Sequence, residues 1–150
     1  MSEEMGAKEM GAKVGLSLEK GMIFKCDLGD INVKDLYIDE EHNKEKDMIG
    51  PNPSRLLGLA ILGCLSASFA FCLKKKEFEV EDLKAEADVV IRRNEKGFWR
   101  VKEINVNIKS KINEPDAKKR AEQCKKMFEQ FCIVTQSVRE GIEVNVNLNF

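Results

Sequence analysis

The sequence of 150 residues lacks the side chains that metal sites and several common catalytic centres require. It contains one histidine, His42, and no Cys-x-x-Cys spacing, whereas a zinc site needs several Cys or His ligands at such spacings. No glycine-rich phosphate loop and no Ser/His/Asp arrangement stands out either. We therefore expect neither a metal nor a bound cofactor.

The chain also lacks an excess of charge of either sign. It has 25 Lys and Arg against 26 Asp and Glu, a formal net charge of −1. Duplex nucleic acid requires a broad basic face on the protein, so we expect no nucleic-acid partner. An apolar share of 43% is too high for a disordered chain. This length suits one domain, spanning residues 1–150, with its own core.

No basic, apolar and small-residue leader is seen at the N-terminus, and residues 1–12 are typical of a flexible starting segment. The five cysteines are an odd number, which excludes a disulfide framework that pairs every one of them. Both features favour a reducing, cytoplasmic setting. The roles of these five thiols are therefore the main question that the sequence raises.

Residues 13–40 have the pattern of short strands. Three runs, at residues 14–18, 22–28 and 31–38, contain alternating apolar residues, and Gly21 and Gly29 stand at the turns between them. Such runs with turn residues between them predict an antiparallel meander. Residues 39–48 are charged and have no apolar period, which indicates a loop.

Charge is absent from the 18 residues between Leu56 and Leu73. Pro53 suits the first turn of a helix there, because its missing N–H would have no intrahelical partner. A helix that is apolar all round is either a membrane span or the centre of a core. Two serines, two glycines and three alanines lower the hydrophobicity of this run, and basic residues flank both ends. We therefore favour a buried central helix over a membrane span.

The second half of the chain predicts a hairpin, a helix and a last strand. Residues 83–93 and 98–111 form the two arms of the hairpin, with Gly97 in its turn. Asn113 is an expected N-cap for a helix that ends near Gly141. Residues 142–150 alternate strictly between apolar and polar, which is typical of a strand. The order is βββ-α-ββ-α-β, an α+β fold with antiparallel sheets.

Four of the cysteines form two pairs with the same spacing. Cys64 and Cys72 are eight residues apart, as are Cys124 and Cys132, so each pair lies near one face of its expected helix. If the two helices pack antiparallel, Cys64 can face Cys132 while Cys72 faces Cys124, which gives two dithiol sites. The alternative is that each is a buried thiol acting as a small hydrophobic residue. We expect that role for Cys26.

Two stretches of the sequence resemble the signature of the OsmC/Ohr family, the osmotically inducible and organic-hydroperoxide-resistance proteins. One stretch has a proline-rich entry, two leucines and a cysteine in a small-residue helix: Gly50-Pro51-Asn52-Pro53-Ser54-Arg55-Leu56-Leu57, Ala60 and Leu62-Gly63-Cys64. The other stretch is similar to the helix of that family's second cysteine and to its closing strand: Phe131-Cys132-Ile133-Val134-Thr135-Gln136-Ser137 and Gly141-Ile142-Glu143-Val144. The resemblance extends over residues 14–150.

The resemblance implies an intertwined homodimer built around two central helices, with a thiol-dependent peroxidase site. Cys64 would be the peroxidatic residue, which attacks a hydroperoxide and becomes a sulfenic acid. Cys132 would be the resolving residue, which condenses with it to a disulfide. A dithiol reductant, lipoyl-type or thioredoxin-like, would reset the pair. The apolar surroundings favour organic hydroperoxides as substrates.

The sequence departs from the family pattern around the first cysteine. Ser54 stands where active members have a glutamate, and Lys44 lies in the loop where some relatives keep an arginine. Burial raises the pKa of a thiol, so a cation must compensate at Cys64, and Lys44, Lys46 and Arg55 are the candidates. The alternative for these residues is a solvated charged surface. The alternative function is an OsmC-fold protein without efficient peroxidase activity, a small-molecule-binding or redox-buffering module.

Overall fold

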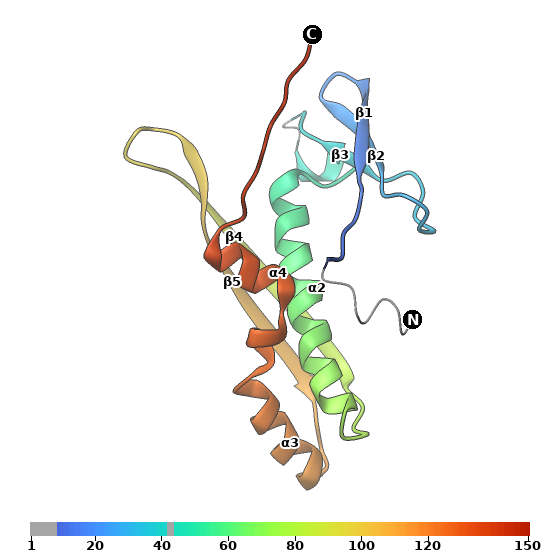
Figure 1. Cartoon of the computed structure of the whole chain (residues 1–150), viewed down its shortest axis with the longest axis vertical. Helices are drawn as coiled ribbons and strands as arrows, with labels where there is room; N and C mark the ends of the chain where they lie inside the picture. The colour runs from blue at the N-terminus through green and yellow to red at the C-terminus, as the bar shows by residue number, and fades with distance from the viewer. Residues whose placement is uncertain (1–8, 42–43) are drawn as a thin grey trace. The chain divides into compact units, whose positions relative to one another are not determined.

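The computed structural model of the chain describes residues 9–41 and 44–150. They fall into two compact units, residues 1–53 and residues 54–150. Figure 1 traces both from blue at the N-terminus to red at the C-terminus. His42 and most of the expected flexible start lie outside the described residues, and the expected single domain stays a prediction.

The N-terminal unit contains the expected meander, an antiparallel sheet in the order β1-β2-β3. Its strands are β1 (Gly15–Lys20), β2 (Ile23–Asp27) and β3 (Tyr37–Asp39). The third strand is much shorter than the strand predicted over residues 31–38, so the predicted length is wrong. Asp35 has a φ of 58°, in the left-handed region, and extended pairing cannot continue through such a residue.

A buried carboxylate holds the end of this unit together. Asp39 is 1% exposed, and its two oxygens accept hydrogen bonds from the backbone N–H groups of Glu41 and Ile49, both at 3.0 Å. The loop between them includes a 3-10 turn, η1 (Glu45–Asp47). Asp39 therefore fixes the point at which the chain leaves the meander.

The C-terminal unit is built on α2 (Pro53–Lys74), which begins at the predicted proline. Its residues Ile61 and Leu65 are buried, and they pack with Ile104, Val106 and Ile108 of the neighbouring hairpin. Gly58 allows the close approach, because a β-carbon there would come within 2.7 Å of Val89 Cγ2. Figure 1 shows α2 lying along the hairpin.

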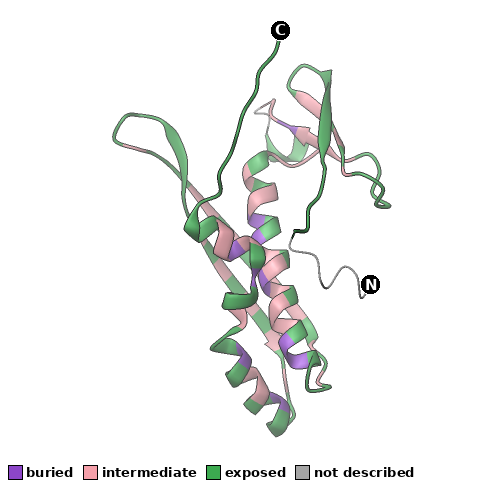
Figure 2. Cartoon of the chain, viewed as in Figure 1, coloured by how far each residue is buried: buried purple, intermediate pink, exposed green. Residues whose placement is uncertain are grey.

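The central helix is buried on one side only. Of the described helices, α2 has the length and composition of a membrane span, yet core helices of soluble proteins share both properties. Only 28% of its apolar window is buried within the chain. The opposite face, which includes Leu59, Gly63, Ala67 and Phe71, is exposed, and Figure 2 shows buried and exposed positions alternating along the helix. The expected burial all round is thus not seen in a single chain.

The hairpin is confirmed. It consists of β4 (Glu81–Arg93) and β5 (Trp99–Lys111), paired antiparallel, with Ala87 opposite Val106. Gly97 has a φ of 86° in the turn, as its predicted role requires. Along β5, half-buried Ile104, Val106 and Ile108 alternate with exposed residues, so one face of the hairpin covers α2.

The prediction of one long second helix is wrong, because the structure breaks this segment into three pieces. These are α3 (Pro115–Lys125), a 3-10 turn η2 (Phe128–Phe131) and α4 (Ile133–Glu140). Glu114, not Asn113, precedes the first helical residue. Met127 has a φ of −132°, and Cys132 is extended at a ψ of 100°, so the α-helical backbone cannot run through either position. Gly141 ends α4 as expected, with a φ of 86°.

The predicted last strand is also wrong for this chain. Residues 141–150 form no strand with any described residue, and their alternating apolar side chains are exposed, Val146 at 85%. A strand is stabilised by hydrogen bonds to a neighbouring strand, and no described strand supplies an edge here. Alternation in a sequence shows that a segment can pair, but not that a partner is present in the same chain.

Candidate active site

The structure brings Cys64 and Cys132 together. Cys64 lies in the middle of α2, and Cys132 lies in the short link between η2 and α4. Cys132 is 0% exposed and packs with Ile61 and Leu65, and half-buried Cys64 borders the same cluster. Both thiols are free, and each influences the pKa of the other. The expected meeting of these two cysteines is therefore seen, although the single helix assumed for Cys124 and Cys132 is broken between them.

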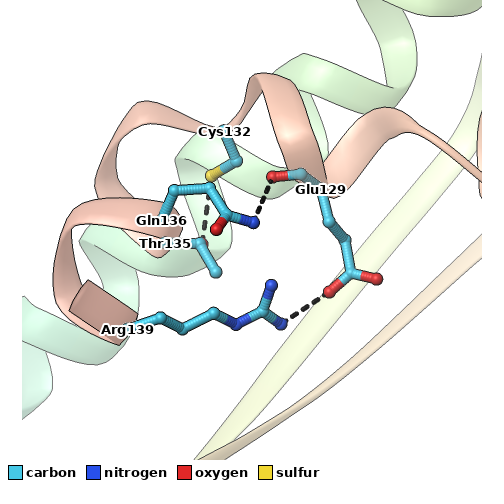
Figure 3. A network of polar contacts seen from close by, with 5 residues as sticks. All are labelled: Glu129, Cys132, Thr135, Gln136 and Arg139. Carbon is cyan, nitrogen blue, oxygen red and sulfur yellow. Dashed lines mark hydrogen bonds and ion pairs between the residues drawn. The ribbon is translucent and has the colours of Figure 1, made fainter.

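Cys132 is the N-cap residue of α4. The first N–H groups of a helix have no partner within the helix, and an N-cap side chain accepts hydrogen bonds from them. The Cys132 side chain makes no capping hydrogen bond to α4, but the nearby backbone N–H groups of Val134 and Thr135 favour its ionised form and so act to lower its pKa. Figure 3 shows the Thr135 hydroxyl beside the sulfur, with Oγ1 3.0 Å from Sγ.

The two thiols have opposite tendencies to ionise. Burial raises the pKa of Cys64, and the hydrogen bond to Cys132 raises it further, while N–H groups of Val134 and Ile133 oppose this without outweighing it. Burial also opposes ionisation of Cys132. Polar contacts with Cys64, with the Thr135 side chain and with the α4 backbone outweigh that effect, so the pKa of Cys132 lies below its ordinary value.

The expected cationic support for Cys64 is not seen. Arg55 and Ser54 lie at the start of α2, and Arg55 precedes Cys64 by nine positions, about 13.5 Å of helical rise. Among the described residues, the groups that shift the Cys64 pKa are Cys132 and the backbone of α4, with no Lys or Arg. Lys44 belongs to the other unit, at the N-cap of η1, and its role stays a prediction.

Sequence reasoning missed a polar network around Cys132, which Figure 3 draws. Gln136 Nε2 donates to the backbone carbonyl of Glu129 at 3.0 Å. Arg139 Nη2 lies 2.6 Å from Glu129 Oε1. The contacts tie α4 back onto η2, on either side of the cysteine. The spacing of Thr135, three residues after Cys132, is the signal that could have indicated an N-cap.

A cavity of about 580 Å³ lies next to this network. Its walls include Leu57, Ile61 and Leu65 of α2 and Ile104 of β5, with Thr135 and Arg139 of α4. Ile61, Leu65 and Thr135 also contact Cys132. The cavity therefore reaches the residues that enclose the thiol pair, and it suits a small molecule with an apolar body.

The second predicted cysteine pair is also present, in bonded form. Cys72 and Cys124 are joined by a disulfide, with their Cα atoms 5.9 Å apart. Both are buried, among side chains that include Phe69 and Phe78. Arg120 donates two hydrogen bonds to the carbonyl of Cys72, at 3.1 and 3.3 Å, which adds a second tie between α2 and α3.

The remaining cysteine lies apart from these pairs in the sequence. Cys26 is half-buried on β2 of the N-terminal unit, and its Sγ lies 3.9 Å from the carbonyl oxygen of Phe24. No three metal-ligating side chains come together in residues 9–41 and 44–150.

Comparison with known families and structures agrees with this geometry. A family model described as OsmC-like protein matches residues 42–147. No curated protein matches the chain. Among solved structures, the organic hydroperoxide resistance protein OhrB of Bacillus subtilis is similar, at 20% identity and a TM-score of 0.63, over 87% of this chain and 91% of its own.

Two further structures extend the likeness. A hypothetical protein from Aquifex aeolicus is 26% identical, with a TM-score of 0.65, over 88% of this chain and 89% of its own. An OsmC-like protein of Vibrio cholerae is 10% identical, with a TM-score of 0.66, over 86% of this chain and 94% of its own. The predicted α+β fold class with antiparallel sheets is therefore confirmed.

Proposed function

Because the chain belongs to the OsmC-like protein family, we propose that it is a thiol-dependent peroxidase that reduces organic hydroperoxides through Cys64 and Cys132. The family and its structural relatives support a role in redox chemistry and peroxide resistance. The observation that carries the proposal is the pair of free thiols that border one buried cluster, next to a cavity with both apolar and charged walls.

The cycle needs two sulfurs and a reductant. One thiolate attacks a peroxide oxygen, the O–O bond breaks, and the alcohol leaves with a proton, so that a sulfenic acid remains on the enzyme. The other thiol displaces water from that sulfenic acid and forms the Cys64–Cys132 disulfide. A dithiol then reduces the disulfide by exchange. We propose a lipoyl-type or thioredoxin-like reductant in the cytoplasm.

We further propose that the working form is a homodimer. OsmC-like proteins are soluble and typically homodimeric. In the single chain, an apolar stripe on α2 and the alternating residues of 142–150 are both exposed. Burial of such surfaces in a second copy would remove a large apolar area from water. Light scattering that gives the mass of one chain at micromolar concentration would contradict this.

The peroxidase proposal is tested by peroxide consumption. Wild-type protein is mixed with cumene hydroperoxide and dihydrolipoamide, beside Cys64→Ser, Cys132→Ser and the matched control Cys26→Ser. We expect turnover in the wild type and the control, and loss of turnover in both of the other variants, because each sulfur is needed for the disulfide. Absent turnover, or turnover that survives both substitutions, would reject the proposal.

A second function is favoured by the surroundings of Cys64. Ser54 replaces the family glutamate, and no cation is among the groups that shift the pKa of Cys64 within the described residues. An OsmC-fold protein of this kind would bind a small molecule or buffer redox state without efficient turnover. Its signature would be a Cys64–Cys132 disulfide that forms once with peroxide and is not reduced by the dithiol on the time scale of catalysis.

A further inference from the structure

We propose that the chain has a second binding site, for a small neutral molecule with an aromatic or branched apolar body and one hydroxyl or carbonyl group. The site is a cavity of about 310 Å³ that α2, β5, α3 and η2 enclose. None of the described residues lines both this cavity and the 580 Å³ cavity next to the thiol pair. The inference therefore goes beyond the proposed peroxidase function.

Two phenylalanine rings belong to the wall of this cavity. Phe69 of α2 and Phe128 of η2 stand edge to face, with ring centroids 5.6 Å apart and an angle of 70° between the ring planes. The other apolar side chains of the wall are Ile108 of β5, Ile112 just after it and Ala121 of α3. Aromatic rings pair favourably in edge-to-face and offset arrangements, so these walls favour a ligand that has a ring of its own.

The size of the cavity suits a compact ligand. Pockets that bind small molecules enclose about 300–1,000 Å³, and an apolar cavity of roughly 150 Å³ is enough for benzene. The volume of about 310 Å³ therefore accommodates one ring with a short substituent. An ordered water needs two to four polar partners, and the inner wall, being apolar except at Ser110, does not supply them.

Ser110 interrupts the apolar side of β5. Ile104, Val106 and Ile108 pack towards α2, and Ser110 is the next residue on that side of the strand. Its Oγ is buried and has no hydrogen-bond partner among the described residues, which costs free energy. Ser110 lines the cavity, and a serine side chain has three staggered positions. A change of rotamer therefore brings the hydroxyl to a polar atom of the bound molecule.

The charges at the cavity favour a neutral ligand. Its charged wall residues are Glu122 and Lys125 of α3, which are both exposed. They lie three positions apart, so they are neighbours on the surface of the helix and have opposite charges. A charged ligand would meet a like charge as well as an opposite one and would gain little from the pair.

The cavity borders both of the buried clusters that contain cysteine pairs. Ile108 and Phe128 pack against the cluster of the thiol pair. Phe69, Ile112 and Ala121 pack against the cluster of the disulfide. A molecule bound in the cavity therefore contacts side chains that support each pair, and it fills the space where α3 and η2 meet the hairpin.

Methyl NMR locates the bound molecule. Protein labelled with 13C at the isoleucine Cδ1 atoms is titrated with benzyl alcohol and, separately, with toluene, which has the same ring and no hydroxyl. We expect saturable shifts at Ile108 and Ile112, and smaller shifts at Ile61 and Ile104, which line the other cavity. Shifts as large or larger at Ile61 and Ile104, or shifts that do not saturate, would overturn the inference.

Ser110→Ala tests the hydroxyl, and Ser66→Ala is the matched control, since Ser66 lines neither cavity. We expect Ser110→Ala to weaken the binding of benzyl alcohol relative to toluene by about fivefold, the effect of one hydrogen bond, and Ser66→Ala to leave that ratio unchanged. An unchanged ratio in Ser110→Ala would overturn the assignment of the ligand's polar group.

A cavity-filling variant tests the site without removing a polar group. Ala121→Leu places a larger side chain in the wall, and we expect it to weaken the binding of both molecules at least about tenfold. Wild-type affinity in this variant would show that both molecules bind elsewhere, and it would overturn the inference.

Discussion

At the scale of single residues, the site depends on which backbone groups surround each sulfur. Cys64 and Cys132 have the same side chain and meet in one apolar cluster, yet Cys132 stands at the N-cap position of α4 and Cys64 lies in the middle of α2. The direction of the pKa shift follows this difference: upward at Cys64, where burial dominates, and downward at Cys132, where the hydrogen bonds outweigh burial. Cys132 therefore loses its proton more readily than Cys64.

This difference predicts how Cys132 titrates. A lowered pKa means that the Cys132 thiolate is populated at a lower pH than a free thiol, whose pKa is about 8.5. We expect the Cβ chemical shift of Cys132 to change with a midpoint below about pH 8.5. NMR of protein with 13C-labelled cysteine across this range measures it, with Cys132→Ser to assign the signal. A midpoint at or above that pH would contradict the prediction.

The sequence allowed the cysteine pairs to be predicted, but not their immediate surroundings. Spacing alone suggested that Cys64 meets Cys132 and that Cys72 meets Cys124. The supporting Thr135, Glu129 and Arg139 were missed because the apolar residues keep helical spacing straight across the breaks at 126–132. A periodic pattern reports which side of a segment faces the core, and it does not report a local change of backbone direction.

At the scale of elements, α2 comes very near the hairpin at a glycine, Gly58. A β-carbon at Gly58 would meet Val89 Cγ2 at 2.7 Å, whereas one at Gly63 would meet nothing within 4 Å. Both positions are in the same helix, where alanine is favoured over glycine by about 1 kcal/mol. Gly63 therefore provides a matched control for Gly58.

We predict that Gly58→Ala lowers the free energy of unfolding relative to Gly63→Ala by about 1–3 kcal/mol, because crowding at a packed contact costs that much. The β-branched Val89 has few alternative rotamers, so it cannot move aside freely. Urea unfolding of the two variants beside the wild type provides the measurement. Equal stability of the two would mean that the helix and hairpin separate without strain.

The elements also show where sequence reasoning stops. The hairpin and the start of α2 were predicted within two residues, because local turn and cap residues define them. The predictions of the last strand and of a full-length third strand were wrong, because each strand depends on pairing with a separate segment. Residues 142–150 have the period of a strand, but in the described part of the chain they lack an edge to join.

At the scale of the whole molecule, the Cys72–Cys124 disulfide closes a loop across 52 positions of sequence. By the chain-entropy argument, a loop of this length stabilises the folded state by about 4 kcal/mol. We predict that the double variant Cys72→Ala/Cys124→Ala melts roughly 10 °C lower than the wild type. Calorimetry with Cys26→Ser as the control measures this. Melting temperatures within a degree or two of each other would show that the bond contributes little.

The same disulfide also determines what happens when the backbone is cut between its two cysteines. The whole β4–β5 hairpin, with its turn at Asn94–Gly97, lies between the two bonded cysteines. The segment is thus a covalent ring, and the rest of the protein is attached to the ring at Cys72 and Cys124. A single backbone break inside it would create two new chain ends without releasing either half. The two sequence segments that carry Cys64 and Cys132 would then remain parts of one molecule.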